Sequence, residues 1–259
     1  MRKSKVLAKL RSGQFARICS TGHYLPFYIR HAAHLGYDGI WLDLEHRTMN
    51  DREAQALIAF CHYNDIDCMV RVPTLGRTHL YHYLEDGASG FMIPFVSTPA
   101  IARQVVEATK FAPLGNRGVY GAGLDGDYGL DVWRPDSTYF EDANRESFIV
   151  AQIETPEALD NIQEIAAVPG IDLLFIGPAD MGQRLRATND PRTMADVIER
   201  VSAAARAHGI AWGITAGSPD EIARHRALGA QMVPWGGDFA LAKVLKQCSE
   251  DLNGILAGE

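Results

Sequence analysis

The sequence has few of the features that mark several common protein classes. Among its 259 residues there are only four cysteines, and none of them forms a CxxC or other paired spacing. Scattered cysteines in a chain of this size are typical of reduced, mostly buried thiols, so we expect a cytoplasmic protein without disulfides. The sequence also has no run of about 18 apolar residues, which excludes a membrane-spanning helix.

Positive charge is scarce as well. The 25 Lys and Arg residues are outnumbered by 32 Asp and Glu residues, and the net charge of −7 argues against nucleic acid as a partner. The nucleotide-binding patterns GxGxxG and GxxxxGK[ST] do not follow any expected strand. The basic start of the chain lacks the apolar segment of a secretory signal. Instead, Val6, Leu7 and Leu10 share one face of a short helix that could plug the bottom of a barrel.

Strand and helix patterns alternate along the chain. Short apolar runs are each followed by a segment with helical periodicity, and about 30 residues separate successive runs. The expected strands cover residues 15–19, 39–44, 68–72, 90–96, 148–153, 172–176, 210–215 and 231–235. Eight such units in about 250 residues favour an α/β fold of the (β/α)8 TIM-barrel type over an open doubly wound sheet. We therefore expect one domain over residues 1–259.

The alternation fails between residues 112 and 147. This stretch is rich in Gly, Asp and Tyr and shows no periodicity. A loop of this length in a compact domain usually serves as an active-site lid, a subunit contact or a disordered insert, and the sequence does not decide among these roles.

Two carboxylates follow neighbouring expected strands. Glu154 follows the fifth strand and Asp180 follows the sixth, so both should lie at the rim where a barrel carries its site. Either residue could instead cap the helix that follows it. Two carboxylates on adjacent strands need a shared proton or a cation between them. A pair of carboxylates completed by waters and a chelating substrate is the usual way to hold Mg²⁺ or Mn²⁺.

The second and third strands end in residues that could act on a substrate. His46 has Asp43 three residues earlier, close enough to orient one ring nitrogen and leave the other as a base, although an exposed pair without a role is the alternative. Arg71 ends an apolar strand, so its guanidinium must meet an anion. That anion is either one of the nearby carboxylates or the carboxylate of a small substrate. The turn at residues 177–180 could add backbone N–H groups for the same substrate.

Six short motifs follow one another along the chain. They are Asp43-Leu44-Glu45-His46, Val70-Arg71-Val72-Pro73, Phe91-Met92-Ile93-Pro94, Arg117-Gly118-Val119, Gln152-Ile153-Glu154-Thr155 and Gly177-Pro178-Ala179-Asp180. In this order and spacing they resemble the motifs of the HpcH/HpaI aldolases, which are metal-dependent class II pyruvate aldolases of the phosphoenolpyruvate/pyruvate barrel superfamily. The resemblance runs from about Gly13 to Ala240.

The resemblance implies specific roles for these residues. Glu154 and Asp180 would bind the divalent metal, which is Mg²⁺, Mn²⁺ or Co²⁺. His46, oriented by Asp43, would be the general base. The pyruvyl group would be bound by Arg71, Gln152 and the backbone of Ala179 and Asp180.

The resemblance also has implications beyond a single site. It implies a homo-oligomer, a trimer or a hexamer, in which the last helix is exchanged between subunits. Asp86 matches a position that reaches a neighbour's site in the family, although an ordinary surface residue is the alternative.

The implied reaction makes or breaks a carbon–carbon bond between pyruvate and an aldehyde, with 4-hydroxy-2-oxo acids as the substrate class. No lysine ends an expected strand, which disfavours a Schiff-base aldolase. The alternatives are a CoA-ester lyase of the same superfamily and a catalytically silent barrel that acts as a binding protein. The chain departs from the family at Ile18-Cys19-Ser20, in the loop after Val119 and at Trp235, where the aldehyde would bind, so the motifs do not indicate which aldehyde is used.

Overall fold

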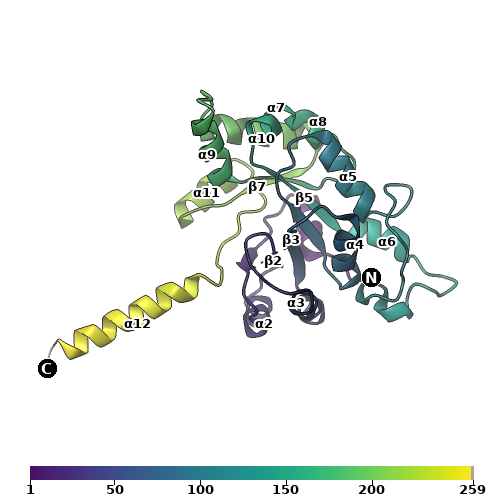
Figure 1. Cartoon of the computed structure of the whole chain (residues 1–259), viewed down its shortest axis with the longest axis horizontal. Helices are drawn as coiled ribbons and strands as arrows, with labels where there is room; N and C mark the ends of the chain where they lie inside the picture. The colour runs from purple at the N-terminus through teal and green to yellow at the C-terminus, as the bar shows by residue number, and fades with distance from the viewer. Residues whose placement is uncertain (258–259) are drawn as a thin grey trace.

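A computed structural model describes residues 1–257, and its centre is a parallel β-sheet (Figure 1). The strands pair in sequence order, and those from β4 to β7 are buried along their whole length. Burial on both faces explains why the strands are apolar without alternation. The seven strands are β1 (Ile18–Thr21), β2 (Gly39–Asp43), β3 (Asp67–Arg71), β4 (Gly90–Ile93), β5 (Phe148–Ile153), β6 (Leu173–Ile176) and β7 (Ala211–Ile214).

The segment at residues 231–238 joins the two edges of this sheet. Met232 forms a parallel bridge with Ala16 on one side and with Gly213 on the other. The Trp235 N–H donates to the Ile18 carbonyl at 2.8 Å, and the Ile214 N–H donates to the Met232 carbonyl at 3.1 Å. The curled sheet is thereby closed into a TIM-barrel-like fold.

The eighth strand predicted at residues 231–235 is therefore present only as isolated bridges. Pro234 has no N–H to donate, and Gly236 has a φ of +90° that turns the chain away from an extended path.

Helices cover the outer face of the sheet (Figure 1). Several begin at the cap residues that the sequence indicates. The side chains of Thr155 and Ser218 each accept the N–H of the residue three positions later, with proline at the first helical position. The helices are α1 (Lys5–Arg11), α2 (Pro26–His34), α3 (Asp51–Tyr63), α4 (Arg77–Glu85), α5 (Pro99–Thr109), α6 (Tyr139–Glu146), α7 (Pro156–Asp160), α8 (Ile162–Ala166), α9 (Pro178–Ala187), α10 (Met194–His208), α11 (Pro219–Ala227) and α12 (Ala240–Leu256).

The sheet separates two apolar cores. One lies between the strands and the surrounding helices. The other fills the interior of the sheet, where Trp41 and Phe175 meet edge to face at 5.7 Å. Val6, Leu7 and Leu10 of α1 are part of this interior core. The prediction that an N-terminal helix plugs the barrel is thus confirmed.

Two helices were not predicted. Residues 178–187 form α9, although Gly177, Pro178 and Gly182 had suggested a turn and a loop. The irregular stretch at 112–147 contains α6 and a short 3-10 segment, Leu124–Gly129, in which Asp127 and Tyr128 have positive φ. Both misses have one physical cause, because tertiary packing stabilises short helices whose sequences carry weak local signals.

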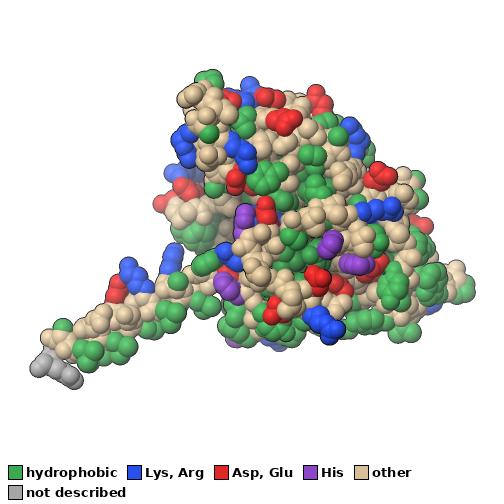
Figure 2. All heavy atoms as spheres, viewed as in Figure 1, with side chains coloured by type: hydrophobic (Ala, Val, Ile, Leu, Met, Phe, Trp, Pro, Cys, Tyr) green, Lys and Arg blue, Asp and Glu red, His purple; other side chains and the backbone are tan. Residues whose placement is uncertain are grey.

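The last helix, α12, extends away from the rest of the molecule (Figure 1). None of its residues is buried, and apolar side chains such as Val244, Leu245, Leu252 and Ile255 are exposed along it (Figure 2). A face of this kind normally packs against another surface. Within residues 1–257, no helix combines the length and the apolar character needed to span a membrane.

Candidate active site

The carboxyl ends of the strands bring together the polar residues that the sequence indicates. Asp43 and Arg71 end β2 and β3 and lie opposite each other in the strand register. Gln152 lies near the end of β5 and pairs in register with Phe175 of β6. Glu154 follows β5 directly, and Asp180 lies in the first turn of α9, after β6. Since the strands are parallel, these residues occupy the same rim.

Arg71 is bound by two carboxylates of the protein itself. Its Nε and Nη2 lie 2.9 and 2.7 Å from the two oxygens of Asp43, and Nη1 lies 3.3 Å from Glu45 Oε2. Its guanidinium also lies 4.9 Å from the centre of the Trp41 ring. Burial alone would raise the pKa of Asp43, but the hydrogen bonds and charge of Arg71 outweigh it and lower that pKa. The sequence left open whether Arg71 pairs with a protein carboxylate or with a substrate carboxylate. In the structure it pairs with the protein carboxylates of Asp43 and Glu45.

His46 lies in the loop after β2, and its side chain is 59% exposed. The nearest carboxylate oxygen is Glu45 Oε2, 3.6 Å from Nε2 of the ring. Asp43 instead accepts the backbone N–H groups of Glu45, at 3.1 Å, and of His46, at 3.3 Å. The expectation that Asp43 orients the imidazole directly is therefore corrected. The Asp43 carboxylate is already committed to Arg71, so Asp43 fixes the backbone of the loop rather than the ring.

Glu154 is a buried carboxylate, only 4% exposed. Its oxygens accept the Phe95 N–H at 3.1 Å and the Gln152 side-chain amide at 3.0 Å. Gly177 makes room for it, because a Cβ at that position would collide with the carboxylate. Burial raises the pKa of Glu154 to about 7; the Phe95 N–H opposes this rise, and the negative charges of Asp180 and Glu45 add to it. A cation would relieve this unfavourable burial of charge.

A second buried oxygen near Glu154 lacks a partner. The side-chain carbonyl Oε1 of Gln152 is buried and accepts no hydrogen bond from any of residues 1–257. Asp180 is 43% exposed on its side chain, and Arg184 approaches it only to 3.9 Å. Oxygen ligands of this kind suit a hard divalent cation such as Mg²⁺ or Mn²⁺. In the part of the chain that is described, no three His, Cys, Asp or Glu residues are grouped to hold a metal by themselves. The residues present therefore fit a metal held by two carboxylates and completed by other oxygen donors.

The first turn of α9 offers donors to an anion. Gly177 precedes the helix, and no side chain caps this end. The N–H groups of the first turn of a helix have no partner within the helix, and those of Ala179 and Asp180 belong to this turn. The predicted turn is thus a helix N-terminus, which suits an anion equally well.

One ionisable pair at the rim was not found from the sequence. Asp238, which follows the closing segment, lies 2.6 Å from Nδ1 of His23 in the loop after β1. The two residues are 215 positions apart, and no local pattern connects them.

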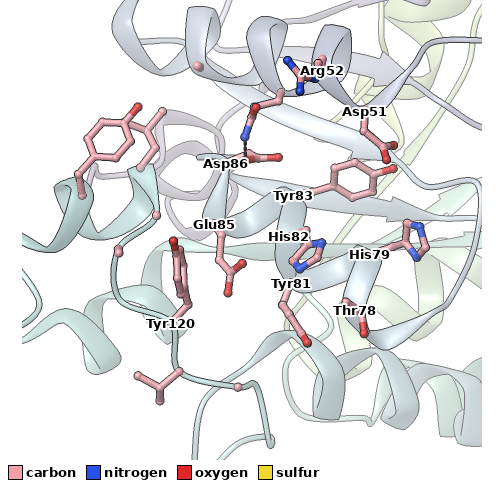
Figure 3. A pocket seen from close by; sticks show the side chains of 18 residues that line it. Asp51, Arg52, Thr78, His79, Tyr81, His82, Tyr83, Glu85, Asp86 and Tyr120 are labelled. Atoms are coloured by element: carbon pink, nitrogen blue, oxygen red, sulfur yellow. Dashed lines mark hydrogen bonds between the residues drawn. The ribbon is translucent and has the colours of Figure 1, made fainter.

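A cavity of about 1180 Å³ is lined by other residues than Asp43, Arg71, Glu154 and Asp180 (Figure 3). It is lined by α3, α4 and the loop that follows Arg117, and Tyr120 lies opposite Glu85 and His82 in it. Asp86 lines this cavity and accepts a 2.5 Å hydrogen bond from Gln55. Asp86 is thus separate from Glu154 and Arg71 within one chain.

Comparisons with known proteins identify the family of this chain. The HpcH/HpaI aldolase/citrate lyase family model matches residues 23–243. A hydroxypyruvate/pyruvate aldolase of Deinococcus radiodurans is 35% identical over 83% of this chain and 77% of its own length. A 4-hydroxy-2-oxovalerate aldolase of Rhodococcus jostii is 33% identical over 80% of this chain and 79% of its own length.

A solved structure extends the similarity to the whole fold. The crystal structure of an HpcH/HpaI aldolase from Desulfitobacterium hafniense superposes with a TM-score of 0.83 and 30% identity, covering 96% of this chain and 95% of that one. The chain therefore belongs to the HpcH/HpaI aldolase/citrate lyase family.

Proposed function

We propose that this chain is a metal-dependent class II aldolase that joins pyruvate, or a related 2-oxo acid, to an aldehyde and cleaves the resulting 4-hydroxy-2-oxo acid. The observation that carries the proposal is the group of buried oxygens at the rim. Glu154 is a desolvated carboxylate with a raised pKa, and the neighbouring Gln152 oxygen accepts no hydrogen bond within the described part of the chain. The aldolase names of the relatives support the same class of reaction.

Glu154 and Asp180 are the proposed metal ligands. A divalent cation such as Mg²⁺, Mn²⁺ or Co²⁺, when bound, supplies the Lewis-acid charge that favours the enolate of pyruvate. Glu154 is held in place by the Phe95 N–H and the Gln152 amide, so its carboxylate is positioned before any ligand binds. Asp180, on the first turn of α9, is more accessible.

Arg71 and the start of α9 are the proposed binding groups for the 2-oxo acid. Asp43 and Glu45 hold the Arg71 guanidinium in one orientation, and a guanidinium has five N–H donors. The donors left over can bind the oxygen that gains negative charge during the reaction. The N–H groups of Ala179 and Asp180 can bind the substrate carboxylate.

His46 is the proposed general base. It would take the proton from the 4-hydroxyl during cleavage and return it during condensation. Its exposed ring is accessible to a substrate, and Asp43 fixes the backbone that carries it.

A metal-reconstitution assay tests the proposal. Chelator-treated protein should release no pyruvate from 4-hydroxy-2-oxo acids, and added Mn²⁺ or Mg²⁺ should restore release. Glu154→Gln should bind Mn²⁺ much more weakly in a calorimetric titration, whereas Glu157→Gln, an exposed neighbour on α7, should bind it like the wild type. Failure of every cation to restore activity across a panel of such acids would contradict the proposal.

The family description also includes citrate lyases, so a CoA-ester lyase is the second candidate. Citryl-CoA and malyl-CoA belong in the same assay. Cleavage of a CoA ester without cleavage of any 4-hydroxy-2-oxo acid would favour this alternative.

We further propose that the chain works as a homo-oligomer in which α12 is exchanged between subunits. The support is the exposed apolar side of α12, none of whose residues is buried against the rest of residues 1–257.

A further inference from the structure

The indole ring of Trp41 lies inside the barrel next to the guanidinium of Arg71. Trp41 belongs to β2 and to the interior core, and it is 8% exposed. It precedes Asp43 by two residues, and alternate residues of a strand point to the same side of the sheet. The guanidinium carbon of Arg71 lies over the Trp41 ring, 4.9 Å from its centre. Arg71 is thus hydrogen-bonded along one edge by Asp43 and packed against the ring of Trp41.

Hydrogen bonding within the chain does not explain why an indole occupies this position. Nε1 of Trp41 is buried and donates to no acceptor among residues 1–257. An indole N–H can only donate, and its burial without a partner is unfavourable, so an aliphatic or phenyl side chain would fill the interior more simply. The ring meets Phe175 edge to face at 5.7 Å, a contact that a phenyl ring could also make. What distinguishes tryptophan is its stronger attraction for a cation, and the cation over its ring is Arg71.

The charges around Arg71 favour a neutral ring as its third contact. Asp43 and Glu45 already place two carboxylates on the guanidinium, and the Arg71 side chain is 12% exposed. A further carboxylate would also hold Arg71, but it would repel the carboxylate of a 2-oxo acid. The face of an aromatic ring attracts a guanidinium without adding a net charge, and the attraction is strongest where water is excluded. Contact with Trp41 therefore restrains Arg71 without neutralising it.

We propose that Trp41 is a positioning residue for Arg71. Its ring keeps the guanidinium in the orientation in which the donors not used by Asp43 and Glu45 reach the 2-oxo acid. The inference rests on the proposed aldolase function and adds to it a residue that affects binding of the 2-oxo acid through Arg71.

Pyruvate binding to the Mn²⁺-loaded protein tests this inference. In a calorimetric titration, Trp41→Leu should raise the Kd for pyruvate about fivefold or more, the loss expected when a partly desolvated cation–π contact is removed. Trp41→Phe keeps a ring face, so its Kd should lie between those of the wild type and Trp41→Leu. The Kd for Mn²⁺ measured without pyruvate should stay near the wild-type value in both variants, because Trp41 acts through Arg71 and not through the proposed metal ligands.

Phe148→Leu is the matched control. Phe148 is a fully buried aromatic residue of the same interior core, but it begins β5 and so lies at the end of the barrel away from the rim. Both leucine variants remove a buried ring and should lower the midpoint of thermal unfolding. Only Trp41→Leu should raise the Kd for pyruvate, a difference that loss of packing alone would not produce.

Fluorinated tryptophan tests the contact without removing a side chain. Fluorine atoms withdraw electron density from the indole face and weaken its attraction for a cation, while the ring keeps nearly the same shape. In protein made with mono-, di- and trifluorotryptophan at all four tryptophan positions, the Kd for pyruvate should rise with each added fluorine. The same series in Trp41→Phe should leave the Kd unchanged, which assigns the effect to Trp41 rather than to another tryptophan. This measurement decides the question even if Trp41→Leu does not fold.

The outcomes separate the two proposals. If the wild type binds pyruvate in a Mn²⁺-dependent manner but fluorination leaves the Kd unchanged, Trp41 does not position Arg71 and only this inference is overturned. Equal Kd values for Trp41→Leu and Phe148→Leu would overturn it as well. If no divalent cation allows the wild type to bind pyruvate or to release it from any 4-hydroxy-2-oxo acid, the aldolase function is overturned and the inference falls with it.

Discussion

Arg71 donates two parallel hydrogen bonds to Asp43 across neighbouring strands, with Nε 2.9 Å from Oδ1 and Nη2 2.7 Å from Oδ2. The two residues are partners in the register of β2 and β3, and both side chains are largely buried. A bidentate pair of this kind fixes the plane of the guanidinium. The pair therefore sets the direction in which the remaining donors of Arg71 can reach a substrate.

Replacement of Asp43 should impair binding of the 2-oxo acid. In Asp43→Asn, Arg71 loses its charged partner and the loop that carries His46 loses part of its anchor. We expect kcat/KM for a 4-hydroxy-2-oxo acid to fall about 10- to 100-fold, as for other losses of a positioned charged contact. Steady-state kinetics with Mn²⁺ measure this, with Asp51→Asn as an exposed control. Unchanged kinetics would show that Arg71 needs no partner.

The same pair predicts a pH dependence of stability. Because the pKa of folded Asp43 is below its ordinary value of 3.8, the unfolded chain binds a proton there more readily than the folded one. The stabilisation is complete above the unfolded pKa and is lost as the pH falls through the folded pKa. The difference in unfolding free energy between wild type and Asp43→Asn should therefore shrink below about pH 4. Urea titrations from pH 3 to 6 measure it, and a difference independent of pH would contradict the ion pair.

His46→Gln should separate chemistry from binding. If His46 is the base, its loss should lower kcat by about 100-fold or more, the range typical of general acid–base catalysis. Because the ring contacts no proposed metal ligand, affinity for Mn²⁺ and pyruvate should stay near that of the wild type. His34→Gln, an exposed histidine of α2, is the control and should behave as the wild type. If His46→Gln kept the turnover of the wild type, the assignment of His46 as the general base would be wrong.

The irregular segment at 112–147 is anchored by a buried ion pair. Arg117 Nη2 lies 2.6 Å from Asp125 Oδ2, and the same oxygen accepts the Tyr139 hydroxyl at 2.7 Å. Both side chains of the ion pair are about 2% exposed. Asp125→Asn should destabilise the protein by about 3 kcal/mol or more, because it leaves a buried guanidinium without its counter-charge. Thermal or urea unfolding measures this against Asp136→Asn, whose side chain is exposed; equal stability of the two variants would contradict the argument.

The sequence predicted most of the strands and most of the residues at their carboxyl ends because these features depend on residues that are close together in the chain. Strand-length apolar runs and the polar residues that follow them are neighbours in the chain, so Glu154, Arg71 and His46 could be placed at the strand ends. Contacts across the barrel could not be found in this way. The pairing of His23 with Asp238 depends on closure of the sheet.

The sequence also did not predict which neighbour the Asp43 carboxylate would bind at the rim. Asp43 has both an imidazole and a guanidinium within reach, and only the structure shows that it binds the guanidinium of Arg71 and the backbone of His46. The helix α9 was missed because glycine and proline at its start suggest a turn.

The last helix gives a prediction about assembly. Leu245 is 70% exposed on the apolar side of α12, and Val244 beside it is also exposed. If another subunit covers this side, a charge there must be buried on association, which is unfavourable without a partner. Leu245→Asp should therefore shift the protein towards smaller species in sedimentation velocity, whereas Gln247→Asp, two residues along the same helix, should shift it less. A wild-type chain that sediments as a monomer would contradict the exchange of α12. Identical sedimentation of the two variants and the wild-type oligomer would show that the subunits associate through another surface.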